Sequence, residues 1–257
     1  MHRINIFRVF WMIASIGVGF GIVWLWQVSA DNRWVSPVSL PGPDRAWTAL
    51  MRGFTRGELL ENLIGTVERM IWGWLLASLV GVALGALIGI SARARAYLGP
   101  MLEFLRPLPA SAIIPVAIAL LGLSDGMVLA VIAFGALWPM LLATIHGFAA
   151  VEPRLYEVSR ALGLSRLEVI WKIALPNAMP DILSGMRLGL TIALILAVVG
   201  EMLAGRQGLG QWILLAARAF RAPDLFAGVI LLGLLGFASA LVLSAIEQRL
   251  LRWRKTH

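Results

Sequence analysis

Ionisable side chains are scarce in the long apolar stretches of this chain, so the few that occur there are the first candidates for chemistry. Arg187 and Glu201 share one such stretch, fourteen positions apart, which is about 21 Å along a helix and too far for a pair within it. Charged groups inside a bilayer often mark ion pathways. Both residues lie near the ends of the stretch, where long side chains reach the interface. We therefore interpret Glu201 as an interfacial carboxylate, with a gate-lining role as the alternative.

Other reactive groupings are missing from the sequence. The chain has no cysteine, and His2, His146 and His257 are too scattered to hold a metal. We interpret His146 as a boundary residue rather than a proton relay. Neither Lys172 nor Lys255 follows a glycine, so the Gly-x4-Gly-Lys-Ser/Thr loop that binds ATP phosphates is absent. The sequence predicts no enzyme and no cofactor, and an energised function would need a separate nucleotide-hydrolysing partner.

The elements that must position these residues are membrane helices. Hydrophobic residues make up 60% of the chain and the mean hydropathy is +0.84, far above soluble domains. An apolar run of about 20 residues crosses the hydrocarbon core as a helix. The sequence predicts an all-α integral membrane protein with six spans, at 9–30, 70–90, 107–124, 126–145, 182–204 and 225–246.

Basic residues indicate the orientation of these spans. The termini, the connection between the second and third spans, and the connection between the fourth and fifth spans with Arg187 on its flank carry 14 Lys and Arg residues. The opposite side carries 7, with Arg69 near a boundary. Because positive loops stay in the cytoplasm, both termini and the fourth-to-fifth connection are predicted to be cytoplasmic. The net charge of +8 is then a topology signal, and no nucleic-acid partner is predicted.

The N-terminal run resembles a signal peptide, with basic residues before it and Val28-Ser29-Ala30 after it. Its apolar stretch is longer than the 7–15 residues usual for such a segment, so we predict a retained first helix over residues 1–30. Residues 31–61 are predicted to be an external loop followed by an amphipathic helix from about Asp44. The membrane core that follows is assigned to residues 62–248, and a basic cytoplasmic tail to 249–257.

Small residues recur at every fourth position of the second span, at Gly73, Ala77, Gly81, Gly85 and Gly89. This spacing keeps them near one face of a helix and lets another helix approach closely. We favour packing inside the subunit, with a subunit interface or pore wall as alternatives.

Prolines interrupt the start of the third span. Arg106-Pro-Leu-Pro109 precedes Pro115 by a few residues, so this part lacks backbone donors and is predicted to bend. Irregular backbone at membrane depth survives where it is buried in protein or lines a cavity. Pro109 and Pro115, with Glu201, are therefore candidates for a translocation path, and a simple turn into the membrane is the alternative.

The most informative polar segment is the insert 152–176. Pro153 suits the first turn of a helix, and Gly163 suits the left-handed turn that ends it. Ser165 and Glu168 have the spacing of a capping box, which starts a second helix that is predicted to end near Pro176.

Val158, Ala161 and Leu162 share one side of the first of these helices. Such a side can dock into the groove of a partner, and the alternative is a loop that lies on the bilayer surface.

The insert resembles a known motif. Glu157-Val-Ser-Arg-Ala-Leu-Gly163, nine residues to Ile173 and then Leu175-Pro176 is similar to the "EAA" loop of ATP-binding-cassette (ABC) importer permeases. Val158 and Ser159 replace the two alanines of the family pattern. Ile114-Pro115 and Gly200-Glu-Met-Leu203 with Gly208-Leu-Gly210 look like the nitrate, sulfonate and taurine branch of that family.

The resemblance implies a type I ABC importer permease fold with a five-helix core and a coupling loop at 148–180. It also implies that the chain lies in the lipid bilayer of a bacterial inner membrane. Its implied partners are a second permease chain in a homodimer, a cytoplasmic ABC ATPase dimer, and a periplasmic or lipid-anchored substrate-binding protein. The residues that it assigns to ATPase coupling are Glu157, Ser159, Ala161, Leu162, Gly163, Ile173, Leu175 and Pro176.

The solute is expected to be a small organic or inorganic anion such as a sulfonate, taurine or nitrate. The rival function is a stand-alone channel or an ion-coupled secondary carrier, which would need no ATPase.

Overall fold

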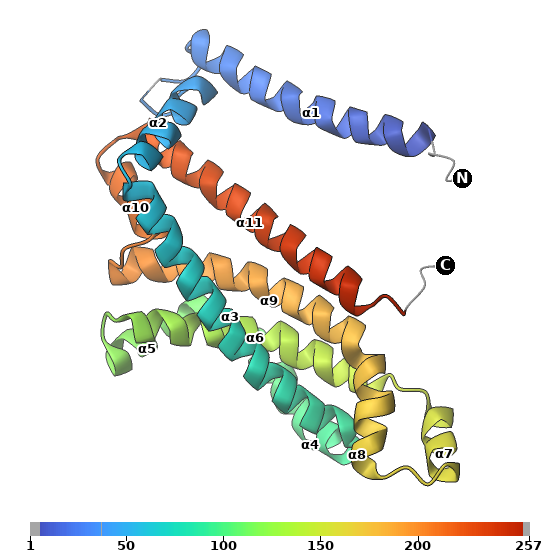
Figure 1. Cartoon of the computed structure of the whole chain (residues 1–257). Helices are drawn as coiled ribbons and strands as arrows, with labels where there is room; N and C mark the ends of the chain where they lie inside the picture. Colours follow the sequence, from blue (N-terminus) through green and yellow to red (C-terminus); the bar gives the residue numbers. More distant parts are fainter. Residues whose placement is uncertain (1–5, 37, 254–257) are drawn as a thin grey trace. The chain divides into compact units, whose positions relative to one another are not determined.

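The computed structural model describes residues 6–36 and 38–253, and the regular elements within them are all helical (Figure 1). Contacts divide the chain into two compact units, one of Met1–Glu61 with Trp212–Leu232 and the other of Asn62–Gln211 with Gly233–His257. The helices are α1 (Ile6–Asp31), α2 (Pro43–Thr55), α3 (Glu58–Ile90), α4 (Ala92–Leu105), the 3-10 turn η1 (Ala110–Ile113), α5 (Ile114–Leu121), α6 (Asp125–Ala149), α7 (Pro153–Ala161), α8 (Arg166–Val169), the π-helical turn η2 (Ile170–Ala174), α9 (Leu175–Ala204), α10 (Leu209–Arg218) and α11 (Ala222–Leu250).

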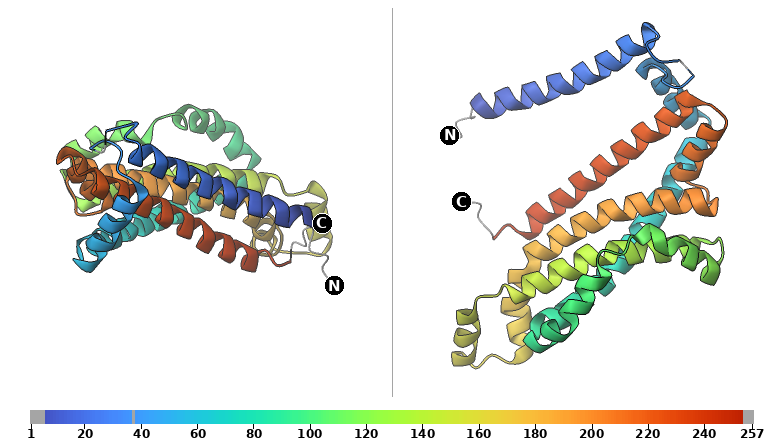
Figure 2. Two further views of the ribbon diagram at one scale, coloured as in Figure 1. Left: turned by 90° about the horizontal axis from the view of Figure 1, so that it is seen from above. Right: turned by 180° about the vertical axis from the view of Figure 1, so that it is seen from behind.

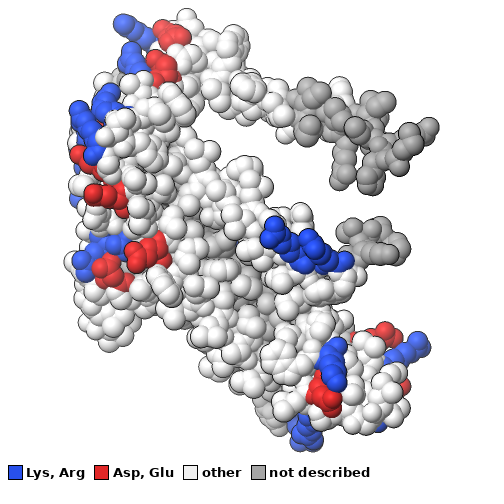
Figure 3. All heavy atoms as spheres, viewed as in Figure 1, with Lys and Arg blue, Asp and Glu red and all other residues white. Residues whose placement is uncertain are grey.

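Within the described residues, four helical runs are long and apolar enough to cross a bilayer: α3, α6, Arg166–Ala204 and α11. A fifth span arises if α4 and the bent segment after it form one crossing. The first predicted span is the single helix α1, but part of it lies outside the residues whose side chains are described, so its crossing stays a prediction. On the face shown in Figure 3, charged side chains gather in separate groups, and most of the remaining described surface is uncharged.

The region before the third predicted span differs from the prediction. Residues 92–105, which we expected to be a connection, form the helix α4 because the Ser91 hydroxyl accepts a hydrogen bond from the Ala94 N–H at 3.2 Å and so caps it. Arg93 and Arg95 interrupt the apolar run, so hydropathy did not predict this helix. The bend predicted from the prolines is present: α4 meets the Ala110–Leu121 segment at 80°, and α5 is only eight residues long.

The small residues of α3 pack against α6, as we favoured. A Cβ built on Gly73 would lie 2.4 Å from the Ile132 side chain, and one on Gly85 would lie 2.6 Å from Thr144 Cβ and 2.8 Å from the Leu141 carbonyl oxygen. These contacts leave no room for a methyl group. The glycines therefore set how closely α3 approaches α6.

The contact between α6 and α9 follows the same rule, and the two helices lie side by side in Figure 2. A Cβ on Gly147 would lie 3.0 Å from Ala178 Cα, and one on Gly185 would lie 2.8 Å from the Pro139 carbonyl oxygen. We call α3, α6 and α9 the three-helix body. Its core includes Met127, Ile132, Met140, Ala193 and Ala197, all of them buried.

In the other unit, α2 begins where the amphipathic helix was predicted. It buries Ala46, Ala49 and Leu50 and leaves Trp47 exposed. The connection from α1 is fixed by the Trp26 indole N–H, which donates to the Pro41 carbonyl oxygen at 2.8 Å. The helix itself is thus confirmed, while its external position stays a prediction.

The glycine contacts predict a selective loss of stability. Gly85→Ala should destabilise the protein by about 1–3 kcal/mol, because the added methyl overlaps the α6 backbone and must displace a helix. Gly233→Ala is the matched control, since a Cβ there meets nothing within 4 Å. Thermal unfolding of the purified variants in one detergent measures the difference. Equal melting temperatures for the two variants would contradict the packing described here.

Candidate functional site

The first helix of the 152–176 loop is α7, which begins at Pro153 and stops at Ala161 as predicted. Gly163 has φ of +67°, a left-handed conformation that favours glycine. Its N–H donates to the Arg160 carbonyl oxygen at 3.1 Å, and the Leu164 N–H donates to that of Ser159 at 3.0 Å. This pair of bonds is a Schellman motif, so the turn has a fixed geometry.

The two sides of α7 differ in burial. Ser159 is only 2% exposed, and its hydroxyl donates to the Tyr156 carbonyl oxygen at 2.8 Å. On another side Leu155, Val158 and Leu162 are 38%, 53% and 70% exposed, and their i, i+3, i+7 spacing aligns them along the helix. We call these three residues the apolar stripe. It is an exposed apolar face on a short, rigidly ended helix.

The second helix begins with the predicted capping box. The Glu168 N–H donates to the Ser165 hydroxyl oxygen at 3.3 Å, and the Ser165 N–H donates to the Glu168 carboxylate at 3.0 Å. The Lys172 ammonium donates to the same carboxylate at 2.8 Å. Lys172 and Ser165 together lower the pKa of Glu168 to about 2, so the box stays charged at any physiological pH.

The predicted end of this helix at Pro176 is wrong. The chain continues from α8 through η2 directly into α9, and Pro176 lies in the first turn of α9. A proline inside a helix normally loses one backbone bond and clashes with the preceding turn. Here the wider π-helical turn at Ile170–Ala174 precedes it and accommodates the ring. The loop is therefore continuous with α9.

The base of the loop is held by a buried cluster of Phe148, Val151, Ala174, Ala178 and Ile182, against which Ile173 and Leu175 pack. The eight residues assigned to coupling thus fall into three groups. Ile173, Leu175 and Pro176 are partly buried at the base, whereas Glu157, Ala161 and Leu162 are exposed on α7. Ser159 and Gly163 fix the shape of α7 and its turn.

At the other end of α9, Glu201 is not the interfacial carboxylate that we expected. It is fully buried, and hydrogen-bond donors that the sequence did not reveal satisfy its carboxylate. The Thr66 hydroxyl donates to Oε2 at 2.9 Å, the Gly210 N–H donates to Oε2 at 3.0 Å, and the Arg69 guanidinium donates to Oε1 at 3.2 Å. We call Thr66, Arg69, Glu201 and the Gly210 N–H the Glu201 cluster.

Arg69 extends this cluster to further elements. Its guanidinium donates to the Gln207 carbonyl oxygen at 2.7 Å and to Asp125 at 2.9 Å. Sequence reasoning missed Thr66 and Arg69 because they lie more than 130 residues from Glu201, and no spacing rule joins such positions. The one available signal was a basic residue at the edge of an apolar run.

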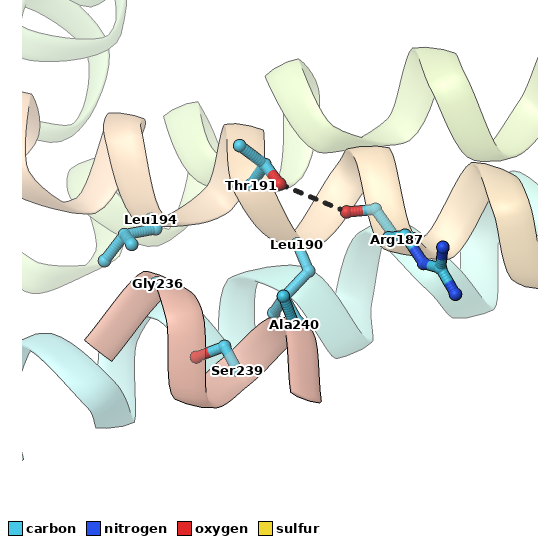
Figure 4. A pocket seen from close by; sticks show the side chains of 7 residues that line it. All are labelled: Arg187, Leu190, Thr191, Leu194, Gly236, Ser239 and Ala240. Carbon is cyan, nitrogen blue, oxygen red and sulfur yellow. Dashed lines mark hydrogen bonds between the residues drawn. The ribbon is translucent and has the colours of Figure 1, made fainter. Parts of the chain in front are cut away.

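Arg187, the other charge in α9, pairs with Glu247 of α11. It lines a cavity of about 140 Å³ between these helices (Figure 4). Thr191 and Ser239 are the other polar residues of its lining, and each donates its hydroxyl to a carbonyl of its own helix, Thr191 to Arg187 and Ser239 to Leu235. Pro109 and Pro115 are exposed at the start of η1 and α5 and do not line this cavity.

The family model for binding-protein-dependent transport system inner membrane components matches residues 70–255, which includes both the loop and Glu201. The chain belongs to this family. The permease is 33% identical to a putative aliphatic sulfonates transport permease protein of Bacillus subtilis (strain 168), over 92% of this chain and 86% of that protein. It is 29% identical to a taurine transport system permease protein of Escherichia coli (strain K12), over 93% and 89%.

A solved inward-facing structure of the MetNI methionine ABC transporter matches with a TM-score of 0.66 at 17% identity, and covers 76% of this chain and 97% of that one. The predicted type I ABC importer permease fold is thereby confirmed. The chain is a multi-pass permease component of an ABC importer.

Loss of the capping box should loosen the start of the second loop helix. Ser165→Ala removes the acceptor for the Glu168 N–H, and such caps contribute about 1 kcal/mol. We expect faster amide hydrogen exchange over residues 165–172 by about fivefold, with α6 unchanged. Ser124→Ala, which removes the cap of α6, is the control and should loosen only the start of that helix. Exchange in the loop that matches the parent protein would show that the box is dispensable.

Proposed function

We propose that this permease imports a small anion and is driven by a cytoplasmic ABC ATPase dimer that acts on the 152–176 loop. The observation that carries the proposal is the apolar stripe of α7. Three large apolar side chains on a short helix are costly to leave in water and suit a hydrophobic groove. The Schellman turn fixes the end of this helix and the capping box fixes the start of the next one, so the loop keeps one shape, which a coupling element needs.

The loop also has a direct mechanical connection to the spans. Ile173 and Leu175 pack on the buried cluster at the ends of α6 and α9, and the loop runs without a break into α9. A force applied to α7 is therefore transmitted to α9 rather than absorbed by a flexible linker. ATP-driven closure of the ATPase dimer would shift the permease between inward- and outward-facing states through this connection.

We assign both termini and the loop to the cytoplasm of a bacterial cell from the twofold excess of basic residues on that side. Arg3, Arg254 and Lys255, which contribute to that count, lie outside the described residues. The transport pathway would form between two copies of the permease, and a periplasmic or lipid-anchored binding protein would deliver the solute on the opposite side.

The solute class is inferred from the relatives, whose names refer to aliphatic sulfonates and to taurine. We propose a sulfonate, taurine or nitrate-type anion. Reconstituted complex should take up at least one of taurine, methanesulfonate and nitrate when its binding protein and ATP are present. Uptake confined to solutes that carry neither a sulfonate group nor nitrate, in the same vesicles, would overturn this assignment.

Leu162→Asp should prevent association with the ATPase, because it places a charge at the most exposed position of the apolar stripe. Leu162 is exposed, so the variant should fold and insert normally. We expect the amount of ATPase that co-purifies in mild detergent to fall by about tenfold or more, in line with the loss of an apolar anchor. Leu162→Met keeps the apolar surface and is the control. Full recovery of ATPase with Leu162→Asp would favour the rival function, a stand-alone channel or secondary carrier.

Gly163→Pro should separate ATP hydrolysis from uptake. Proline cannot adopt φ of +67° and has no N–H to donate to Arg160. The variant should still reach the membrane, because a Cβ added at Gly163 would meet no other residue within 4 Å. ATPase activity and solute uptake of reconstituted complexes are the measurements, and normal uptake would count against coupling through this turn.

A further inference from the structure

The Glu201 cluster is the most extensively bonded buried polar group in the described part of the chain, and the coupling loop does not explain it. Its members come from α3, α9 and the start of α10, and Arg69 adds Asp125 at the start of α6. A buried carboxylate is costly unless hydrogen bonds satisfy it. Glu201 accepts three such bonds, so specific hydrogen bonds compensate the cost of burying its carboxylate.

Thr66 is central to the cluster because it bonds in two directions. Its oxygen accepts the Leu209 N–H at 2.8 Å while its hydroxyl lies 2.9 Å from Glu201. The next N–H, that of Gly210, donates to Glu201 itself. Two successive backbone donors at the start of α10 are thereby bound to side chains of α3 and α9. Free backbone donors at a helix start are normally left to solvent or a cap.

The backbone before α10 fits tightly against the same residues. A Cβ on Gly208 would lie 2.2 Å from Glu201 Cδ, and one on Gly210 would lie 2.2 Å from the Val198 carbonyl oxygen. A Cβ on Gly65 would lie 3.0 Å from the Gln207 carbonyl oxygen. The turn 205–208 is therefore seated on α3 and α9 by shape as well as by hydrogen bonds.

The cluster lies at the far end of the three-helix body from the loop. α9 has 30 residues and is about 45 Å long, with Leu175 in the loop base and Glu201 near its other end. α6 likewise joins the two ends, with Asp125 at its start and Phe148, a residue of the loop base, near its end. The glycine contacts pack these helices closely, and tightly packed elements transmit displacement rather than absorb it.

We propose that Thr66, Arg69 and Glu201 are positioning residues that fasten the turn 205–208 and the start of α10 to the three-helix body. A displacement of the 152–176 loop thereby reaches the opposite end of the permease. The loop receives the displacement, and the Glu201 cluster passes it to the turn 205–208 and the start of α10. This inference rests on the proposed coupling role of the loop.

Two near-isosteric variants test this role: Glu201→Gln removes the charge that Arg69 contacts, and Thr66→Val removes the hydroxyl that bonds to Leu209 and Glu201. In complexes reconstituted with ATPase and binding protein, we expect uptake of the taurine or methanesulfonate probe to fall by about tenfold, within the range of ordinary coupling energies. ATP hydrolysis should stay within about twofold of the parent. Thr66→Ser keeps the hydroxyl and should restore uptake. Asp224→Asn, which breaks a surface ion pair with Arg221, is the control.

The ratio of uptake to ATP hydrolysis separates this role from a purely structural one. If the cluster only stabilises the fold, uptake, ATP hydrolysis and melting temperature will fall together, and the proposal is wrong. Normal uptake in both variants would also overturn it. Failure of the parent chain to bind any ATPase would instead contradict the proposed function.

Discussion

Close approach of helix backbones at glycine is the constraint on which the rest of this permease depends. In a bilayer, helices gain little from burying apolar surface, because the lipid is equally apolar, so packing and hydrogen bonds must hold them together. Gly85 against Thr144 and Gly147 against Ala178 bring α3 and α9 onto α6. The tight fit makes three long helices into one body whose two ends carry different polar structures.

The two ends of the three-helix body accommodate their charged side chains in opposite ways. At the loop end, charges such as Glu168 and Lys172 are exposed and paired, and the apolar stripe of α7 is what remains uncovered. At the far end, the carboxylate of Glu201 is enclosed and fully bonded. An exposed apolar surface suits reversible binding of a partner, whereas a buried charge network suits a fixed contact between elements of one chain.

Much of the loop could be predicted because its rules are local. Pro153, Gly163 and the Ser165 capping box each act within a few residues, and the structure has them where the sequence places them. Pro176 misled the prediction because a π-helical turn, which no short pattern announces, removes its usual effect. α4 was missed because its charges resembled those of a loop.

The far end could not be predicted from spacing. Thr66 and Arg69 meet Glu201 only after three helices have packed, and a buried carboxylate looks the same in sequence as an interfacial one. The glycines of α3 were informative about which face packs but could not identify α6 as the partner.

Coupling in this permease depends on the ATPase acting on the 152–176 loop. A cryo-EM map of the permease with its co-expressed ATPase, at a resolution that shows side chains, would test it most directly. We expect Leu155, Val158 and Leu162 to be buried in a cleft of the ATPase, with the α7 geometry unchanged. A map in which the ATPase binds elsewhere and the apolar stripe faces lipid or solvent would show that the loop does not couple the ATPase to the permease.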